Sequence, residues 1–401
     1  MLRFPVSRNG LVYDRPSYAH EAFPEGTSWP HPLLACSPCV GLDTPKRAAL
    51  ELGIPWKSTN MMDLRRDLRG CLSRLHGGSC QAGLGPISGN VMQVKMANLT
   101  DADCLVSGPP CPPYSSMGLR GRGLDPRSDV LQAVGEQILT LARRGCLAFF
   151  ILENVEGMYK RAAGEDMSYG HRFKMMLSDL LPEGWAVKLC YVNARDTGVP
   201  HHRPRVFLIG ARPEMLATPS QRLLWCRQPR RVEPVPLRAV LDPISEPSGY
   251  EGLAINQKLN VDERLREWED VRHRREPPAE IAIVDIARDT AKKFDGDLGI
   301  DESHTLRLNN AHLWIVPASH LYDVYGKKGR LLTFDEKSRL CGIVPQSLGG
   351  LSASSIETAL GNCIPVPLIG TVMVPLLRAW LEMHRSQILG ALPQSKLEMH
   401  R

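Results

Sequence analysis

The 401-residue chain lacks internal repeats, low-complexity segments and paired CxxC motifs. Its 11 cysteines are scattered, and the one close pair, Cys36 and Cys39, has no second pair at the spacing of a zinc site. We therefore expect reduced thiols, a reducing compartment and no bound metal. Free thiols also leave room for a reactive cysteine.

No apolar run suggests a membrane span, and the first residues lack the apolar stretch of a secretory signal. The net charge of +6 is compatible with a polyanionic partner but is also common among soluble enzymes. We expect a soluble, intracellular monomer without a membrane partner. We place it in the nucleus if the source is eukaryotic, and otherwise in the cytoplasm or nucleoid.

Short apolar runs alternate with amphipathic stretches from about residue 32 onward. The predicted strands are Leu33–Cys36, Cys104–Ser107, Leu147–Leu152, Ala186–Asn193 and Val206–Gly210. The predicted helices between them are Pro45–Leu52, Ser128–Ala142 and His171–Leu181. This alternation predicts an α/β fold with a parallel, doubly wound sheet, whose last two strands are antiparallel neighbours at the edge.

The segment with the strongest chemical signal is Ser107–Gly118, which directly follows a predicted strand. It places Cys111 at the carboxyl end of that strand, where α/β sheets bind their ligands. The prolines before Cys111 hold the backbone rigid, as covalent catalysis requires. A proline-rich loop with an incidental buried cysteine explains this segment equally well on its own.

Two further segments combine strand ends with charged side chains. Glu153 follows the apolar run Phe149–Leu152 and can bind a base edge or transfer a proton, although a solvated turn is the usual role of such a residue. Arg203 and Arg205 alternate into the next strand, so both point to one face and suit a phosphate or carbonyl oxygen. A basic sheet edge is the alternative explanation.

Together these three segments resemble the cytosine-5 DNA methyltransferase family. Four more stretches carry the resemblance: Asp125–Leu131, Ser303–Leu306, Arg330–Gly342 and Gly361–Asn362. Order and spacing agree over roughly residues 33–212 and 303–384, and chance is a poor explanation for the whole combination. The resemblance implies a Rossmann-like S-adenosylmethionine-dependent methyltransferase with a smaller inserted target-recognition domain.

The resemblance also implies the catalytic roles. Cys111 attacks C6 of the target cytosine, Glu153 contacts N3 and the exocyclic amine, and Arg205 holds the base through O2. Arg203 and Arg205 are the candidates for lowering the pKa of the Cys111 thiol. The implied substrate is double-stranded DNA. Because this chemistry cannot reach a base inside the duplex, the target cytosine has to flip out of it. The loop Ser115–Asp129 then resembles a lid.

Arginines in that loop, Arg120, Arg122 and Arg127, are candidates for phosphate contacts, with simple solvation as the alternative. The same two interpretations apply to the basic residues Arg230, Arg231, Arg272, Arg274 and Arg275 of the inserted segment.

For the cofactor S-adenosylmethionine, the family pattern implies a glycine-rich turn after the first strand. The candidate binding residues are Gly41, Asp63, Asn90, Pro110 and Asn362. The chain departs from the pattern at Asp43, which stands where a second glycine is expected, and at Asn90, which replaces an acid. Asp43 instead suits the cap of the following helix.

Five segments follow from this organisation. They are an irregular arm (1–30), the catalytic domain (31–215), the target-recognition domain (216–302), a part completing the catalytic domain (303–386) and a tail (387–401). The predicted helices in the third and fourth segments are Val261–Arg275, Ala279–Phe294, Leu332–Leu340, Ser354–Gly361 and Thr371–His384.

Three alternatives stay open. An RNA methyltransferase would share the catalytic set, a DNA-binding scaffold without turnover would fit the unusual cofactor turn, and a Rossmann enzyme with a nucleotide cofactor is disfavoured by the missing glycine fingerprint.

Overall fold

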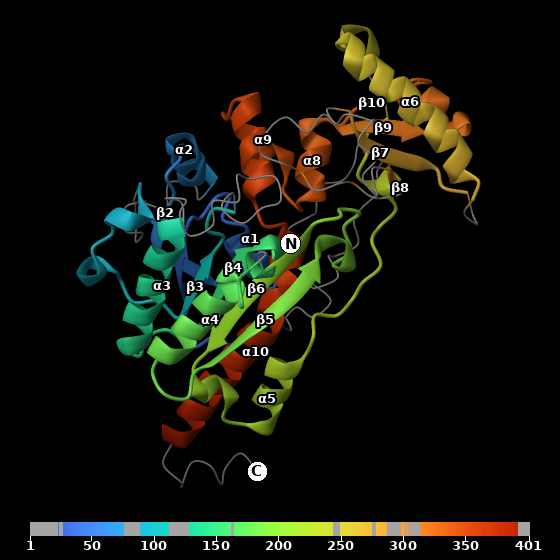
Figure 1. The fold of residues 1–401 in the computed structure, drawn as a ribbon. Helices are drawn as coiled ribbons and strands as arrows, with labels where there is room; N and C mark the ends of the chain where they lie inside the picture. Colours follow the sequence, from blue (N-terminus) through green and yellow to red (C-terminus); the bar gives the residue numbers. More distant parts are fainter. Residues whose placement is uncertain are drawn as a thin grey trace. The chain divides into compact units, whose positions relative to one another are not determined.

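The structure is a computed structural model in which the described chain forms two compact units; Figure 1 labels most of their helices and strands. The described residues are 23, 27–75, 89–111, 128–161, 164–243, 249–274, 278–286, 298–300, 303, 306 and 313–391. We call one unit the central-sheet unit (residues 21–192, 204–230 and 369–401) and the other the small-sheet unit (1–20, 193–203 and 231–368). The predicted lid residues 115–127 with their arginines, residues 1–22 of the arm, Arg275 and the tail beyond 391 lie outside the described residues.

A six-stranded sheet in the order β2-β1-β3-β4-β6-β5 forms the central-sheet unit. Its strands are β1 (Leu33–Pro38), β2 (Trp56–Met62), β3 (Cys104–Ser107), β4 (Phe149–Asn154), β5 (Ala186–Asn193) and β6 (Pro204–Ala211). Strands β1 to β4 are parallel, β6 runs antiparallel to β4, and β5 lies at the edge beside β6. The predicted α/β, Rossmann-like fold class is confirmed.

Helices cover this sheet through apolar side chains at helical spacing. They are α1 (Thr44–Glu51), α2 (Arg66–Leu75), α3 (Ser128–Arg143), α4 (Tyr169–Leu180), α5 (Pro219–Cys226) and α10 (Val366–Ala391), which enters the unit at residue 369. Val134 and Ile138 of α3 and Leu177 of α4 share one buried core with Phe150 and Leu152 of β4. This packing holds the carboxyl end of β4 in place.

Strand β2 is absent from the predicted strands because its sequence, Trp56–Met62, is mostly polar in the middle. Ser58 and Thr59 are nevertheless buried, and the strand pairs with β1 along its whole length. The ladder of main-chain hydrogen bonds therefore decides its conformation, rather than apolar alternation.

The small-sheet unit contains a four-stranded sheet in the order β10-β9-β7-β8. Its elements are α6 (Ile255–Arg272), β7 (Ile281–Asp285), β8 (Leu298–Ile300), β9 (Leu313–Pro317), α7 (Tyr322–Tyr325), β10 (Arg330–Leu331), α8 (Phe334–Leu340) and α9 (Ala353–Asn362). The predicted helix Ala279–Phe294 is wrong, because β7 occupies its first half. The run Ile281–Val284 is fully buried and rich in β-branched residues, which favour a strand between two partners.

The two units divide the chain at other positions than the predicted domain boundaries, which stay a prediction. Residues 303–368 group with the small sheet, and only the chain from 369 onward groups with the central sheet. Within the described residues, Ala353–Arg385 is long and apolar enough to cross a membrane by length and composition. Inside the protein 83% of its apolar window is buried, as in the core helix of a soluble protein.

Candidate active site

The loop that carries Cys111 is fastened on both sides at the carboxyl end of β3. The hydroxyl of Ser107 donates a hydrogen bond of 2.6 Å to the carbonyl of Pro38. The side-chain amide of Asn154 donates one of 3.4 Å to the carbonyl of Pro109. Cys111 is half-buried, and its sulfur lies 3.8 Å from the same Pro109 oxygen. The nucleophile candidate is thus partly accessible on a loop tied to the end of β4.

Glu153 and Arg205 form a buried ion pair in the central-sheet unit. The Nε of Arg205 lies 2.6 Å from Oε1 of Glu153, and the two side chains are 9% and 4% exposed. β6 lies beside β4, with Phe207 opposite Glu153, which brings the start of β6 to the end of β4. Since β3 and β4 are parallel neighbours, with Ser107 opposite Leu152, the loop of Cys111 and the carboxyl of Glu153 leave the sheet at one edge.

Arg203 has a different environment from Arg205, although only Pro204 separates them. Arg203 belongs to the small-sheet unit, is 2% exposed, and donates hydrogen bonds to three main-chain carbonyls. The acceptors are Leu306 at 3.0 Å, Gly361 at 2.7 Å and Cys363 at 2.9 Å. Through these hydrogen bonds Arg203 joins segments of its own unit. The predicted role of Arg203 towards the thiol stays a prediction.

The turn after β1 has a conformation suited to a glycine-rich loop. Cys39, Gly41 and Asp43 all have left-handed backbone angles, with φ of 55°, 55° and 50°. Asp43 occupies the position before α1, but its side chain makes no capping hydrogen bond, so the predicted cap is wrong in that respect. An aspartate tolerates this backbone region better than most residues, which explains how it can replace a glycine here.

Gly41 and Asp63 lie together at the carboxyl ends of β1 and β2. The main-chain N–H of Gly41 donates to Oδ2 of Asp63 at 3.0 Å, and that of Arg65 donates to Oδ1 at 2.8 Å. A Cβ on Gly41 would meet no atom within 4 Å. Burial raises the pKa of Asp63, although the hydrogen bonds from these two N–H groups oppose the rise. The carboxylate retains free lone pairs for a ligand hydroxyl beside an open backbone.

The three remaining cofactor candidates belong to different segments of the chain. The side-chain oxygen of Asn90 accepts a 3.0 Å hydrogen bond from the N–H of Met92 and so caps the short turn Val91–Gln93. Pro110 is half-buried next to Cys111. Asn362 is the last residue of α9 in the small-sheet unit. Their contacts with a cofactor stay a prediction.

A family model described as C-5 cytosine-specific DNA methylase matches residues 85–377. The chain belongs to this family. It is therefore a methyltransferase of the cytosine-5 class, as the sequence motifs predict.

Relatives of this DNA methylase include bacterial Type II methyltransferases. It is 26% identical over 297 residues to the Type II methyltransferase M.NlaX of Neisseria lactamica, covering 74% of this chain and 81% of that protein. It is 25% identical over 237 residues to M.NlaIV of the same species, covering 56% and 54%. Among solved structures, a Spodoptera frugiperda DNMT2 mutant matches with a TM-score of 0.57 and 14% identity, covering 86% and 99%. That likeness concerns the fold.

Two residues of the methylase site, Asn154 and Cys39, have no predicted role from sequence. Asn154 ties the loop of Cys111 to β4. Its position directly after Glu153 is the feature of the sequence that could have indicated this role. Cys39 lies in the turn after β1, and burial, Asp63 and Cys111 together raise the pKa of its thiol to about 12, against a hydrogen bond with Ser107. Cys39 is thus a neutral thiol, and no spacing rule distinguishes it from the other cysteines.

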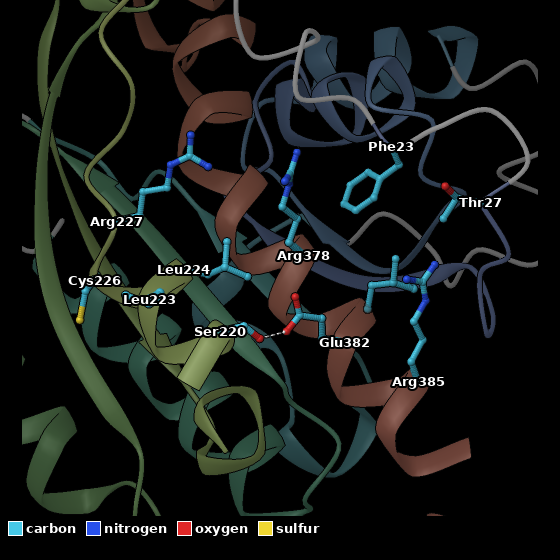
Figure 2. A pocket seen from close by; sticks show the side chains of 11 residues that line it. Phe23, Thr27, Ser220, Leu223, Leu224, Cys226, Arg227, Arg378, Glu382 and Arg385 are labelled. Atoms are coloured by element: carbon cyan, nitrogen blue, oxygen red, sulfur yellow. Dashed lines mark hydrogen bonds between the residues drawn. The ribbon is translucent and has the colours of Figure 1, made fainter. Parts of the chain in front are cut away.

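A cavity of about 860 Å³ lies elsewhere in the central-sheet unit of the methylase, between α5 and α10. Figure 2 shows its lining, where Ser220 donates a 2.8 Å hydrogen bond to Glu382. The guanidinium of Arg378 lies 5.9 Å from the ring centre of Phe23. None of the candidate site residues lines this cavity, so we assign it no part in methyl transfer.

Proposed function

We propose that the protein transfers a methyl group from S-adenosylmethionine to C5 of a cytosine in double-stranded DNA, through a covalent adduct with Cys111. One observation carries this proposal. A half-buried thiol and a carboxyl held by an arginine leave one edge of the sheet together, in a member of the cytosine-5 methylase family. The bacterial relatives named as Type II methyltransferases support DNA as the substrate.

In the proposed mechanism the thiolate of Cys111 forms a bond to C6, and the electron pair of the C5–C6 double bond moves to C5. Glu153 binds N3 and the exocyclic amine, and so stabilises the enamine that makes C5 nucleophilic. Arg205 keeps the Glu153 carboxyl oriented through the 2.6 Å ion pair. After methylation at C5, loss of the C5 proton and cleavage of the S–C6 bond restore the ring and the thiolate.

The residues around Gly41 fit the proposed cofactor. The open backbone at Gly41 allows a ligand to approach closely, and the Asp63 carboxylate suits ribose hydroxyls. Pro110, Asn90 and Asn362 are the further proposed contacts. When bound, S-adenosylmethionine supplies the electrophilic methyl group that C5 takes.

Covalent trapping tests the proposal directly. DNA of mixed sequence containing 5-fluorocytosine is expected to form a denaturation-resistant adduct with the protein when S-adenosylmethionine is present, because fluorine at C5 cannot leave as a proton does. Denaturing gels and intact-protein mass spectrometry measure the adduct. Adducts with matched RNA but none with DNA would move the substrate to RNA, and none with either would contradict the enzymatic proposal.

The cofactor turn makes a second prediction. In Gly41→Ala the new Cβ points into open space, so the protein should lose only about 1–2 kcal/mol of stability from its left-handed backbone. If the cofactor passes over Gly41, the same methyl group should raise the KM for S-adenosylmethionine at least about tenfold, through lost contact of roughly 1.4 kcal/mol or more.

Gly53→Ala is the matched control for this experiment. Gly53 also has a left-handed backbone (φ of 81°) and open space at its Cβ, but it lies beyond α1 and away from the proposed cofactor turn. Equal KM values for the two variants would remove Gly41 from the cofactor site.

A further inference from the structure

Three possible metal ligands meet at the opposite end of strand β3 from Cys111. Asp103 directly precedes β3, His31 lies two residues before the neighbouring β1, and His384 lies in α10. All three belong to the central-sheet unit. None has a part in the proposed methyl transfer.

The ligand atoms of these residues lie close enough together to share one ion. All of them are within 4.8 Å of one another, and Nδ1 of His31 lies 3.6 Å from Oδ2 of Asp103. The two imidazole rings are 5.1 Å apart at 85°. Zinc bonds of about 2.0–2.2 Å place ligand atoms roughly 3.4 Å apart. To close the remaining gap, His31, whose side chain is 39% exposed, has to rotate and give up the 2.9 Å contact of its Nδ1 with the carbonyl of Pro32.

His384 provides an unused donor atom at this place. Its Nε2 is buried and has no hydrogen-bond partner among the described residues. The positive charge of Arg212, which acts on His384, is engaged with Glu214 through hydrogen bonds of 2.8 and 3.0 Å.

Asp103 is held in a fixed position for ligation. The N–H of Leu34 donates to its Oδ2 at 2.8 Å, and its own main-chain carbonyl accepts from Ala148 at 2.7 Å. Its carboxyl is 14% exposed beside His31. The hydrogen bond from Leu34 orients the carboxylate, as partners of ligating groups do in metal sites.

We propose that His31, Asp103 and His384 bind a divalent transition metal ion, with Zn²⁺ as the ion of best fit. Two imidazoles and one carboxylate without a thiolate suit Zn²⁺, whereas Mg²⁺ and Ca²⁺ prefer oxygen ligands alone. The ion ties the C-terminal helix α10 to the amino ends of β1 and β3. Its effect is therefore on the stability of the central-sheet unit, and S-adenosylmethionine binding and methyl transfer do not require it.

Metal titration of the full chain tests this proposal. Metal-free protein is expected to bind one equivalent of Co²⁺ with the weak visible bands of nitrogen and oxygen ligands, and without the intense near-ultraviolet band of thiolate ligation. Zn²⁺ should displace it and raise the Tm by at least about 3 °C at a concentration 100 times its Kd. The variants His31→Gln, Asp103→Asn and His384→Gln should each weaken binding at least tenfold.

His320→Gln is the control, because His320 is an exposed histidine that lies 3.9 Å from Glu280 in the small-sheet unit. It should bind Co²⁺ like the original protein. The Tm of each variant in a chelator shows whether it folds. A thiolate band, an affinity unchanged in all three variants, or no binding by the folded original protein would each overturn the proposal.

Discussion

Cys111→Ala is expected to lower methyl transfer to DNA by at least about 10³-fold, because it removes the nucleophile that we propose forms the bond to C6. The adduct with 5-fluorocytosine DNA should disappear as well. The fold should not change, since Cys111 is half-buried and alanine is close to cysteine in size. Transfer of radiolabelled methyl groups, with Tm as the check on folding, measures both effects.

The exposed cysteine Cys226 in α5 provides a matched control. Cys226→Ala makes the same substitution at another free cysteine and should keep full activity. If Cys111→Ala retained more than a tenth of the activity, covalent catalysis through this residue would be refuted. If both variants lost activity equally, the loss would reflect general thiol chemistry instead of a nucleophile.

The fold and the ends of its central strands could be predicted from sequence because the two patterns that define them are local. The apolar run Phe149–Leu152 and the run before Ser107 each fill a buried strand, and the polar residues that follow mark the sheet edge. The predicted helix Ser128–Ala142 agrees with α3 to one residue. By contrast, strand β7 could not be predicted, because it lies in a charged segment and its conformation depends on pairing with β8 and β9.

The partners of site residues could not be predicted in the same way. Alternation along the chain implies that Arg203 and Arg205 point to one face, yet they contact different segments and belong to different units. The carbonyls that Arg203 binds lie more than 100 residues further along the chain. Only tertiary structure brings such acceptors to a guanidinium, so residue type and spacing leave its partner undetermined.

The ion pair of Glu153 and Arg205 predicts a large stability effect. Arg205→Met should cost about 3–5 kcal/mol of unfolding free energy, because it leaves the buried Glu153 carboxyl without its counter-charge. Methyl transfer should also fall, since Glu153 loses the group that orients it. Urea unfolding and a methyl-transfer assay measure the two effects.

The double variant Glu153→Gln with Arg205→Met separates these effects. Once the carboxyl is neutral, no uncompensated charge remains, so at least half of the lost stability should return. Activity should stay low, because the amide cannot stabilise the enamine as the carboxyl does. A double variant as unstable as Arg205→Met alone would show that Arg205 stabilises the protein through other contacts.

Arg203→Met gives the decisive contrast, because its acceptors are carbonyls and not an acid. It should destabilise the protein by a similar amount, since three buried carbonyls lose their donor. Glu153→Gln should not rescue this variant, because the acceptors of Arg203 are main-chain carbonyls and not a carboxylate. If Glu153→Gln restores stability to Arg205→Met but not to Arg203→Met, Arg205 is the partner of the Glu153 carboxyl. Arg203 is then a residue that holds its own unit together. Rescue of both variants would contradict this division of roles.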